Sequence, residues 1–393
     1  MKILLISSVL PRNNIGGELL LYRHLSLWQT LHLVIATENS EGLHAQEIIK
    51  IQANPLLTRL KKTRLSKWAN DVCQCFDAFY EIKGIRHHIK YNKPDLILTV
   101  AHGELCWLAL RLSKEFNLPL VTLFHDWWPD FVNVHSWGRG VLTNRFQQLY
   151  QHSKLAFCVS EEMRQALGKH PNAKVLFPIS EPFASERYPV GLANSKMFTV
   201  VYAGNLSDIY APMMQALCTA IQEVSEFQLN IFGPQPDWSD ELLQQVKDQG
   251  IYRGFLSKTV LYKVFHQQAH AFLVSMSFNK QKQRRTQVSF PTKLVEYIQF
   301  GKPIIIWGPE YCSAVRWGRK YKAALVVTSP SAEDLIQAII KLANNLGEQK
   351  RLRNKALEMA KNMFNPQSIQ LKFIKSIHEI IDSPSQRKQK YAS

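Results

Sequence analysis

Short apolar runs alternate with amphipathic stretches along nearly the whole chain, and this alternation constrains the fold more than any other feature. Apolar runs of strand length, bounded by turn residues, predict strands that are buried on both faces. The amphipathic stretches between them predict helices that cover those faces, which is the pattern of a parallel sheet in an α/β protein. The strands expected in the first half are Lys2–Val9, His32–Thr37, Asp95–Val100, Leu120–His125, Leu155–Ser160 and Val175–Pro178.

The alternation is interrupted once, between Ile179 and Lys196, where two prolines and many small or polar residues predict an interdomain linker. It then restarts, and a mostly helical region follows. We therefore expect two doubly wound, Rossmann-like domains, residues 1–180 and 197–365, and a final helix over Gln367–Ile381. The strands expected in the second domain are Phe198–Ala203, Leu229–Phe232, Ala271–Ser275, Pro303–Trp307 and Ala324–Thr328.

The chain carries 48 basic and 31 acidic residues, a net charge of +17 with histidine neutral. This charge favours nucleic acid, an anionic lipid surface or a phosphorylated substrate as partner. No nucleic-acid recognition motif accompanies it, so we expect no nucleic acid partner. The six cysteines show neither a C-x-x-C pair nor metal-finger spacing, which predicts reduced, buried thiols in a cytoplasmic protein. The apolar start of the chain predicts a buried strand rather than a signal peptide, and no run is long enough to span a membrane.

Residues 289–309, SFPTKLVEYIQFGKPIIIWGP, form the most distinctive motif. Pro291 and Gly301 are placed to begin and end a helix, with Lys293 and Glu296 on one face of its first turns. A cation at the positive end of a helix predicts phosphate binding, and Glu296 is spaced to accept hydrogen bonds from ribose hydroxyls. The alternative is an ion pair between neighbouring surface side chains.

This motif resembles the donor-site signature of retaining GT-B glycosyltransferases of group 1, which build polysaccharides and glycolipids. The nearest branch has F-P-S-K-x-x-E-Y, and the chain has Phe290-Pro291-Thr292-Lys293 followed by Glu296-Tyr297. Many members carry E-x7-E; Glu296 matches the second glutamate, and Val288 stands in place of the first. The resemblance implies two domains facing a cleft, a nucleoside-diphosphate sugar as donor, and a final helix that returns to the first domain.

Two loops of the first domain are candidates for the reactive region. Gly16 and Gly17 enter a helix after the first strand, where backbone N–H groups can approach an anion; relatives use this loop for the acceptor or the donor diphosphate. His102 follows another strand, in a loop where relatives often place a histidine near the anomeric carbon. The alternatives are a tight turn for the glycines and a capping or merely polar role for His102.

A third loop, His125-Asp126-Trp127-Trp128-Pro129, resembles the H-D-x-W-P segment of the same family. Aromatic rings and carboxylates suit an acceptor sugar, and Asp126 is a candidate base for the acceptor hydroxyl. The alternative is an aromatic plug with a capping aspartate. The spacing from Asp126 to Asp130 is not the D-x-D that holds a metal-bound nucleotide, so we expect no essential metal and no cofactor beyond the donor substrate.

In the second domain, residues 202–206 (Tyr-Ala-Gly-Asn-Leu) match the family's Y-x-G-x-L, with Gly204 and Asn205 expected to contact the donor. Relatives often follow this motif with a basic residue that clamps the diphosphate, and residues 207–211 contain none. Lys293 is one replacement. The basic loop 279–287, with Arg284 and Arg285, is another, either as a lid or as solvated charge. Gly233, after a later strand, lies in the region where relatives read the base.

Residues 55–72 combine five basic side chains with leucines and a tryptophan. Such a helix can lie on an anionic bilayer, and group 1 enzymes with lipid-linked acceptors dock through a similar region. The alternative is a helix packed on its own sheet with a solvated basic face.

The sequence therefore favours a retaining, hexosyltransferase-like enzyme that moves a sugar from a nucleoside diphosphate to a glycan or polyprenyl-linked acceptor. It would be cytoplasmic, with possible attachment to the inner face of the membrane. Two alternatives stay open: a nucleotide-sugar epimerase, and a degenerate GT-B protein that serves as a non-enzymatic partner or membrane scaffold.

Overall fold

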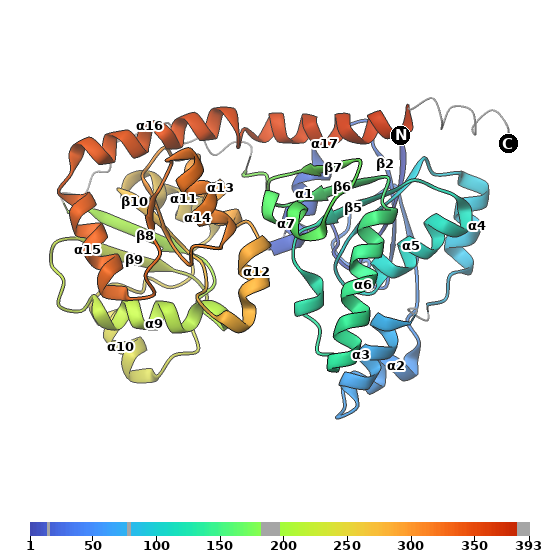
Figure 1. Ribbon diagram of the computed structural model, residues 1–393, viewed down its shortest axis with the longest axis horizontal. Coiled ribbons are helices and arrows are strands. Elements are labelled where there is room, and N and C mark those ends of the chain that lie inside the picture. Colours follow the sequence, from blue (N-terminus) through green and yellow to red (C-terminus); the bar gives the residue numbers. More distant parts are fainter. Residues whose placement is uncertain (14–15, 77–79, 182–196, 383–393) are drawn as a thin grey trace. The chain divides into compact units, whose positions relative to one another are not determined.

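The computed structural model describes residues 1–13, 16–76, 80–181 and 197–382, and it divides into two compact units (Figure 1). Unit 1 contains Met1–Phe177 together with Ile369–Ser393, and unit 2 contains Pro178–Ser368. Most of the expected linker lies outside the described residues.

Unit 1 is built on a seven-stranded sheet in the order β3-β2-β1-β4-β5-β6-β7, in which every neighbouring pair is parallel. Its central strands are buried along their whole length because helices cover both faces, as the continuous apolar runs predicted. The bounds are β1 Lys2–Ile6, β2 His32–Thr37, β3 Glu47–Lys50, β4 Leu96–Val100, β5 Leu120–Phe124, β6 Leu155–Cys158 and β7 Ala173–Val175.

The helices of unit 1 are α1 Gly16–Ser26, α2 Pro55–Leu60, α3 Ser66–Cys75, α4 Lys83–Asn92, α5 Leu105–Phe116, α6 Ser136–His152 and α7 Glu161–Leu167, with a 3-10 turn η1 at Trp128–Asp130. The single helix expected over residues 55–72 is wrong, since α2 and α3 are separate. The Thr63 hydroxyl donates to the Leu60 carbonyl at 2.8 Å and accepts from the Leu65 N–H at 3.1 Å. This side chain thus competes with the helical backbone bonds, and the helix breaks there.

Unit 2 has a five-stranded parallel sheet in the order β12-β11-β10-β8-β9. Its strands are β8 Thr199–Ala203, β9 Gln228–Phe232, β10 Ala271–Ser275, β11 Ile304–Trp307 and β12 Leu325–Val327. The helical elements are η2 Asp208–Tyr210, α9 Ala211–Ala220, α10 Asp240–Asp248, α11 Lys258–Gln267, η3 Lys280–Lys282, α12 Gln283–Val288, α13 Thr292–Ile298, α14 Ser313–Tyr321, α15 Ala332–Ala343 and α16 Leu346–Asn362. The basic stretch expected as a loop at 279–287 is therefore mostly helical, as η3 and α12.

The strand order reverses once in each sheet, between β1 and β4 in unit 1 and between β8 and β10 in unit 2. At such a point the connections leave to opposite faces and open a crevice at the carboxyl ends of the strands, where ligands of doubly wound sheets bind. The loops after β1, β4, β8 and β10 are therefore the places to look for a site.

The last helix, α17 Pro366–Ile381, packs on unit 1 from Ile369 onward (Figure 1). The Phe373 ring lies 5.2 Å from the rings of both His24 in α1 and Phe157 in β6, measured between centroids. Lys174 of β7 donates to Ser376 at 3.0 Å and to Glu379 at 2.7 Å. The helix α17, from the C-terminal part of the sequence, thus completes the hydrophobic core beside the sheet of unit 1.

We expect Phe373→Ala to destabilise unit 1 by about 3–5 kcal/mol, because it leaves a cavity between α17, α1 and β6. Phe373 is 0 % exposed, whereas Leu371 on the same helix is 66 % exposed and gives a matched control, Leu371→Ala, with little effect. Urea unfolding measures both. Equal midpoints for the two variants would contradict the packing role of α17.

Candidate functional site

Lys293, in the first turn of α13, lies at the strand reversal of unit 2. Its Nζ donates to the Tyr202 hydroxyl at 2.7 Å and stands 4.0 Å from the centroid of the same ring. The Tyr210 ring lies 5.5 Å away on another side. The ammonium group is therefore held by the end of β8 and the loop that follows it.

Gly204 makes room for Lys293. A Cβ atom at residue 204 would lie 2.1 Å from the lysine Cε, and the φ angle of +146° also disfavours any other residue. Gly233, after β9, is equally constrained, since a Cβ there would lie 2.2 Å from the Gly204 carbonyl oxygen. Asn205 caps the turn by accepting from the Ser207 N–H at 2.9 Å. These three predicted donor-site residues and Lys293 form one cluster.

The two residues that close the signature have separate tasks. The Tyr297 hydroxyl accepts from the Ala203 N–H at 2.7 Å and donates to its carbonyl at 3.0 Å, which ties α13 to the end of β8. Glu296 accepts a hydrogen bond from the Tyr262 hydroxyl of α11 at 2.6 Å. The sequence did not single out Tyr262, which lies 34 residues away along the chain.

A second cation reaches the same loop from α12. Arg285 Nη1 lies 3.2 Å from Asp208 Oδ2, while its neighbour Arg284 is exposed. Pro291 is the N-cap residue of α13 and Thr292 is its exposed first residue. Because α13 has only seven residues, its dipole is small, and the positive charge at this site comes mainly from side chains.

Burial lowers the pKa of Lys293 to about 7. Removal of an ammonium group from water disfavours its charged form. An anion placed beside Lys293 would favour the charged form again, so the site is suited to bind a phosphate group with uptake of a proton.

In unit 1, Gly17 brings the start of α1 against the loop after β5. A Cβ at residue 17 would lie 3.7 Å from His125 Nδ1, an ordinary van der Waals contact, and Gly16 has a left-handed φ of +61°. The residues between Asn13 and Gly16 lie outside the described part of the chain. Burial, and to a lesser degree His102, lowers the pKa of His125 to about 3, so this imidazole is neutral at physiological pH.

His102, after β4, packs on the neighbouring loop. Its ring lies 4.1 Å from the Trp128 ring and 5.9 Å from the Phe131 ring, centroid to centroid. Burial lowers the pKa of His102, and the Asp126 carboxylate raises it to a smaller extent. Trp127 instead points into the core, where its ring meets Phe146 edge to face at 5.2 Å. Of the two adjacent tryptophans, only Trp128 borders the candidate reactive loop.

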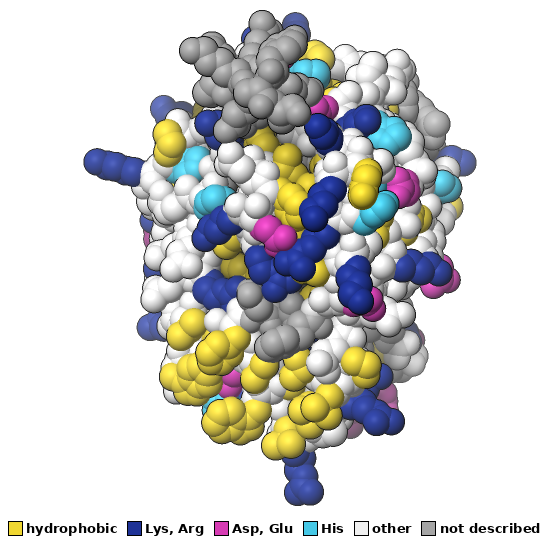
Figure 2. Space-filling model, turned by 90° about the vertical axis from the view of Figure 1, so that its right-hand side faces the viewer, with side chains coloured by type: hydrophobic (Ala, Val, Ile, Leu, Met, Phe, Trp, Pro, Cys, Tyr) yellow, Lys and Arg dark blue, Asp and Glu magenta, His cyan; other side chains and the backbone are white. Residues whose placement is uncertain are grey.

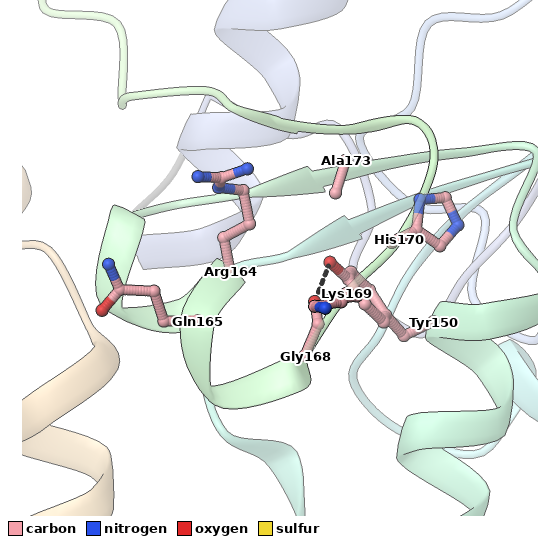
Figure 3. Close-up of a pocket in the computed structure, with 7 residues that line it drawn as sticks. All are labelled: Tyr150, Arg164, Gln165, Gly168, Lys169, His170 and Ala173. Carbon is pink, nitrogen blue, oxygen red and sulfur yellow. Dashed lines mark hydrogen bonds between the residues drawn. The ribbon is translucent and has the colours of Figure 1, made fainter.

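A polar pocket of unit 1 lies apart from these residues, between α6, α7 and β7 (Figure 3). Tyr150 donates to the Gly168 carbonyl at 3.1 Å, His170 bonds the Ser153 carbonyl at 2.9 Å, and Arg164 pairs with Glu161. These side chains thus already bond to other groups of the protein, and the described residues give no indication of a ligand in this pocket.

An exposed apolar and basic surface covers α2, α3 and the start of α6; we call it the α2–α3 patch. Figure 2 shows hydrophobic side chains at the lower end of unit 1, with lysine and arginine side chains beside them. Trp68 is 55 % exposed. The exposed apolar members are Leu56, Leu65, Trp68, Phe76, Trp137 and Val141, and the exposed basic members include Arg59, Lys62 and Arg64. Lys61 is not a member, since it forms an ion pair with Glu104 inside the unit.

All six cysteines are buried and unpaired, as expected. Within the described ranges, no three His, Cys, Asp or Glu side chains gather as a metal ion would require. In the same part of the chain, no helix has the length and apolar character to cross a bilayer.

Two family profiles match the chain, one in each unit. Residues 32–175 match Glycosyltransferase Family 4, and residues 197–345 match Glycosyl transferases group 1. No curated protein sequence matches significantly.

Solved structures resemble the fold over nearly its whole length. A glycosyltransferase from Rickettsia africae is 14 % identical over 97 % of this chain and 98 % of its own, with a TM-score of 0.65. HepE from Anabaena in complex with UDP is 16 % identical over 96 % and 100 %, with a TM-score of 0.63. WaaG, a glycosyltransferase of lipopolysaccharide biosynthesis, is 12 % identical over 94 % and 98 %, with a TM-score of 0.57.

The two Rossmann-like units with parallel sheets confirm the predicted α/β, GT-B fold class. Each unit therefore matches a glycosyltransferase family, Glycosyltransferase Family 4 in unit 1 and Glycosyl transferases group 1 in unit 2.

We expect binding of a ligand with an ionised phosphate group beside Lys293 at pH 8 to be accompanied by proton uptake. The Lys293 amine, with a pKa of about 7, is then mostly uncharged, whereas the anionic ligand favours the ammonium form. Calorimetry in two buffers of different ionisation enthalpy measures the uptake. Lys293→Met should abolish it, and uptake of equal size in that variant would assign the proton elsewhere.

Proposed function

We propose that this protein transfers a sugar from a nucleoside-diphosphate donor, with retention of configuration, to a glycan or polyprenyl-linked acceptor. The observation that carries the proposal is the cluster at the strand reversal of unit 2. There Lys293 lies over Tyr202 beside Gly204, and Glu296 on the next turn is oriented by Tyr262. The solved relatives that hold UDP and UDP-glucose support a donor of this class.

In the proposed donor site, each charged group has one task. Lys293 and Arg285 neutralise the departing diphosphate, which lowers the barrier by stabilising charge that develops in the transition state. Glu296 accepts hydrogen bonds from the ribose hydroxyls, and a carboxylate can accept them while it keeps the bond from Tyr262. The backbone around Gly204 and Gly233, where no side chain intervenes, is the proposed contact for the rest of the nucleotide.

In unit 1, His102 is the proposed group beside the anomeric carbon, Asp126 assists deprotonation of the acceptor hydroxyl, and the loop of Gly16 and Gly17 faces the diphosphate. Because cationic side chains supply the positive charge, we propose that transfer needs no metal ion and no further cofactor. Activity that persists in excess chelator supports this part of the proposal, and activity restored only by magnesium or manganese refutes it.

Two alternative functions, a non-enzymatic role and epimerisation, differ from sugar transfer in what an assay would detect. Val288, in place of the family's first glutamate, is fully buried, so this position does not present a side chain to a donor sugar. Because the first glutamate is missing, a non-enzymatic partner or scaffold protein is the second candidate function. Such a protein would bind nucleotide without catalysing a reaction. An epimerase would convert the donor in the absence of any acceptor.

The α2–α3 patch favours a lipid-linked acceptor at an anionic membrane surface. Its exposed tryptophans and leucines suit the interfacial region of a bilayer, and its lysines and arginines complement anionic headgroups. The chain's net charge of +17 acts in the same direction. We therefore propose peripheral attachment to the cytoplasmic face of a membrane.

We expect Glu296→Gln to weaken UDP binding by about 1.5–3 kcal/mol, because it replaces the charged acceptor of the ribose hydrogen bonds and keeps an oxygen for Tyr262. Glu333→Gln, on α15, is the matched control for loss of one carboxylate. Thermal shift with UDP and a sugar-transfer assay measure the two effects. Unchanged UDP affinity in Glu296→Gln would contradict the donor-site assignment.

Replacement of Arg59, Lys62 and Arg64 by glutamine should reduce binding to vesicles that contain phosphatidylglycerol, by about 1 kcal/mol per residue. The matched control replaces three exposed lysines of unit 2, Lys341, Lys350 and Lys361. Cosedimentation at low salt measures both. The membrane proposal fails if the parent protein does not bind these vesicles. It also fails if both triple variants lose the same amount of vesicle binding.

A further inference from the structure

The loop that carries His102 is held in place by side chains from the α2–α3 segment, residues 55–75. We propose that Gln74 and Lys61 are positioning residues for His102: Gln74 fixes the tryptophan ring against which the imidazole packs, and Lys61 fixes the loop itself through Glu104. This inference rests on the proposed function, because it assigns these two residues to the reaction at His102.

Gln74 joins two tryptophans through one oxygen atom. Its Oε1 accepts a hydrogen bond from Trp107 Nε1 at 2.9 Å and another from Trp128 Nε1 at 3.2 Å. The side chain is 2 % exposed, and its own backbone carbonyl accepts from Arg145 Nη1 at 2.8 Å. Trp107 is 1 % exposed, and an indole N–H buried without an acceptor is costly, whereas Trp128 is half-buried. This single amide oxygen thus restrains both rings.

Trp128 passes this restraint to His102. The two rings lie 4.1 Å apart at an angle of 43°. The Phe131 ring lies 6.4 Å from Trp128, nearly parallel to it at 15°, and 5.9 Å from the His102 ring. The imidazole thus packs against these two aromatic rings, and the position of Trp128 affects its orientation.

Lys61 reaches the same loop from the turn between α2 and α3. It forms an ion pair with Glu104, two residues after His102, and Tyr80 donates to the same carboxylate at 3.4 Å. The side chains of Lys61 and Glu104 are 30 % and 12 % exposed, so the pair is partly shielded from solvent. Gly103 leaves no space beside Ser8, because a Cβ there would lie 2.2 Å from Ser8 Oγ. The loop is thus held between the residues that follow β1 and the α2–α3 segment.

A displaced imidazole should affect turnover rather than donor affinity. The proposed nucleotide contacts lie on Lys293, Arg285 and Glu296 of unit 2 and on the loop of Gly16 and Gly17, and they involve neither Gln74 nor Lys61. A misplacement of about 1 Å at a reacting group can cost on the order of 100-fold in rate. We therefore expect loss of Gln74 or Lys61 to lower kcat by about 10- to 100-fold with little change in the KM for donor.

The first test uses Gln74→Met, which keeps the volume of the side chain and removes the shared acceptor. Proton–nitrogen correlation spectra of the histidine rings follow the titration of His102, whose signal is assigned with His102→Gln. Asp126 and His125 are the ionisable groups that interact with it or with its neighbour ring. Exposure of the ring to water should raise the pKa of His102 towards its ordinary value.

Gln299→Met is the matched control, because Gln299 is another buried glutamine, with its amide on the Phe364 carbonyl of unit 2 at 3.0 Å. It tests whether any loss of buried hydrogen bonds alters His102. A pKa of His102 that is unchanged in Gln74→Met, or that shifts equally in Gln299→Met, overturns the assignment of Gln74.

The second test uses Lys61→Met with its exposed neighbour as the control, Lys62→Met. It applies also if Gln74→Met does not fold. We expect the His102 ring signals to move in Lys61→Met and to stay in Lys62→Met, with turnover falling only in the former. The same spectra for both variants overturn the assignment of Lys61.

The spectral test needs neither donor nor acceptor, so its failure can be told apart from failure of the proposed function. Spectra that move as expected in a protein without transfer activity support the restraint on His102 and refute the transfer reaction. If the protein transfers sugar but neither substitution changes the His102 spectra or the turnover, the restraint on His102 is refuted and the transfer reaction is supported.

Discussion

In a doubly wound sheet every strand ends at the same edge, and the helices that follow leave to one face or the other. Where the strand order reverses, two adjacent connections leave to opposite faces and the edge stays open. In this protein that constraint places the loops after β1 and β4 in one crevice and the loops after β8 and β10 in another. Most candidate donor and reactive residues lie in these loops, and Asp126 and Gly233 follow the adjacent strands β5 and β9 at the same sheet edges. The sheet order thus determines where most of the candidate residues lie.

Within unit 2, the donor-site signature is explained by packing as much as by binding. Tyr297 fixes α13 to β8, Gly204 leaves space for a lysine, and Lys293 fills that space over Tyr202. The cost of removing Lys293 from water appears as its lowered pKa. In the proposed transferase, a lysine that is already held in place would need little reorganisation when a diphosphate binds, and the proton taken up would supply its charge.

Within unit 1, the α2–α3 segment has two faces with different tasks. Its outer face carries the exposed Leu65 and Trp68, which suit a bilayer surface, and its inner face carries Gln74, which holds the ring beside His102. Lys61, the C-cap residue of α2, pairs inward with Glu104, whereas its neighbour Lys62 is exposed.

The sequence by itself determined the fold class, the two parallel sheets and most strand positions, because a strand buried on both faces must be a continuous apolar run. It missed β3, whose four residues EIIK offer only two apolar side chains at the sheet edge. It also identified the α13 signature and the loops of Gly16, His102 and Asp126, since strand ends and helix starts are local features. Only the tertiary structure decided which side chains meet: Tyr262 with Glu296, Arg285 with Asp208, and Gln74 with Trp128. These partners are far apart along the chain, and their contacts depend on how helices pack on the sheet, which no local pattern of residues encodes.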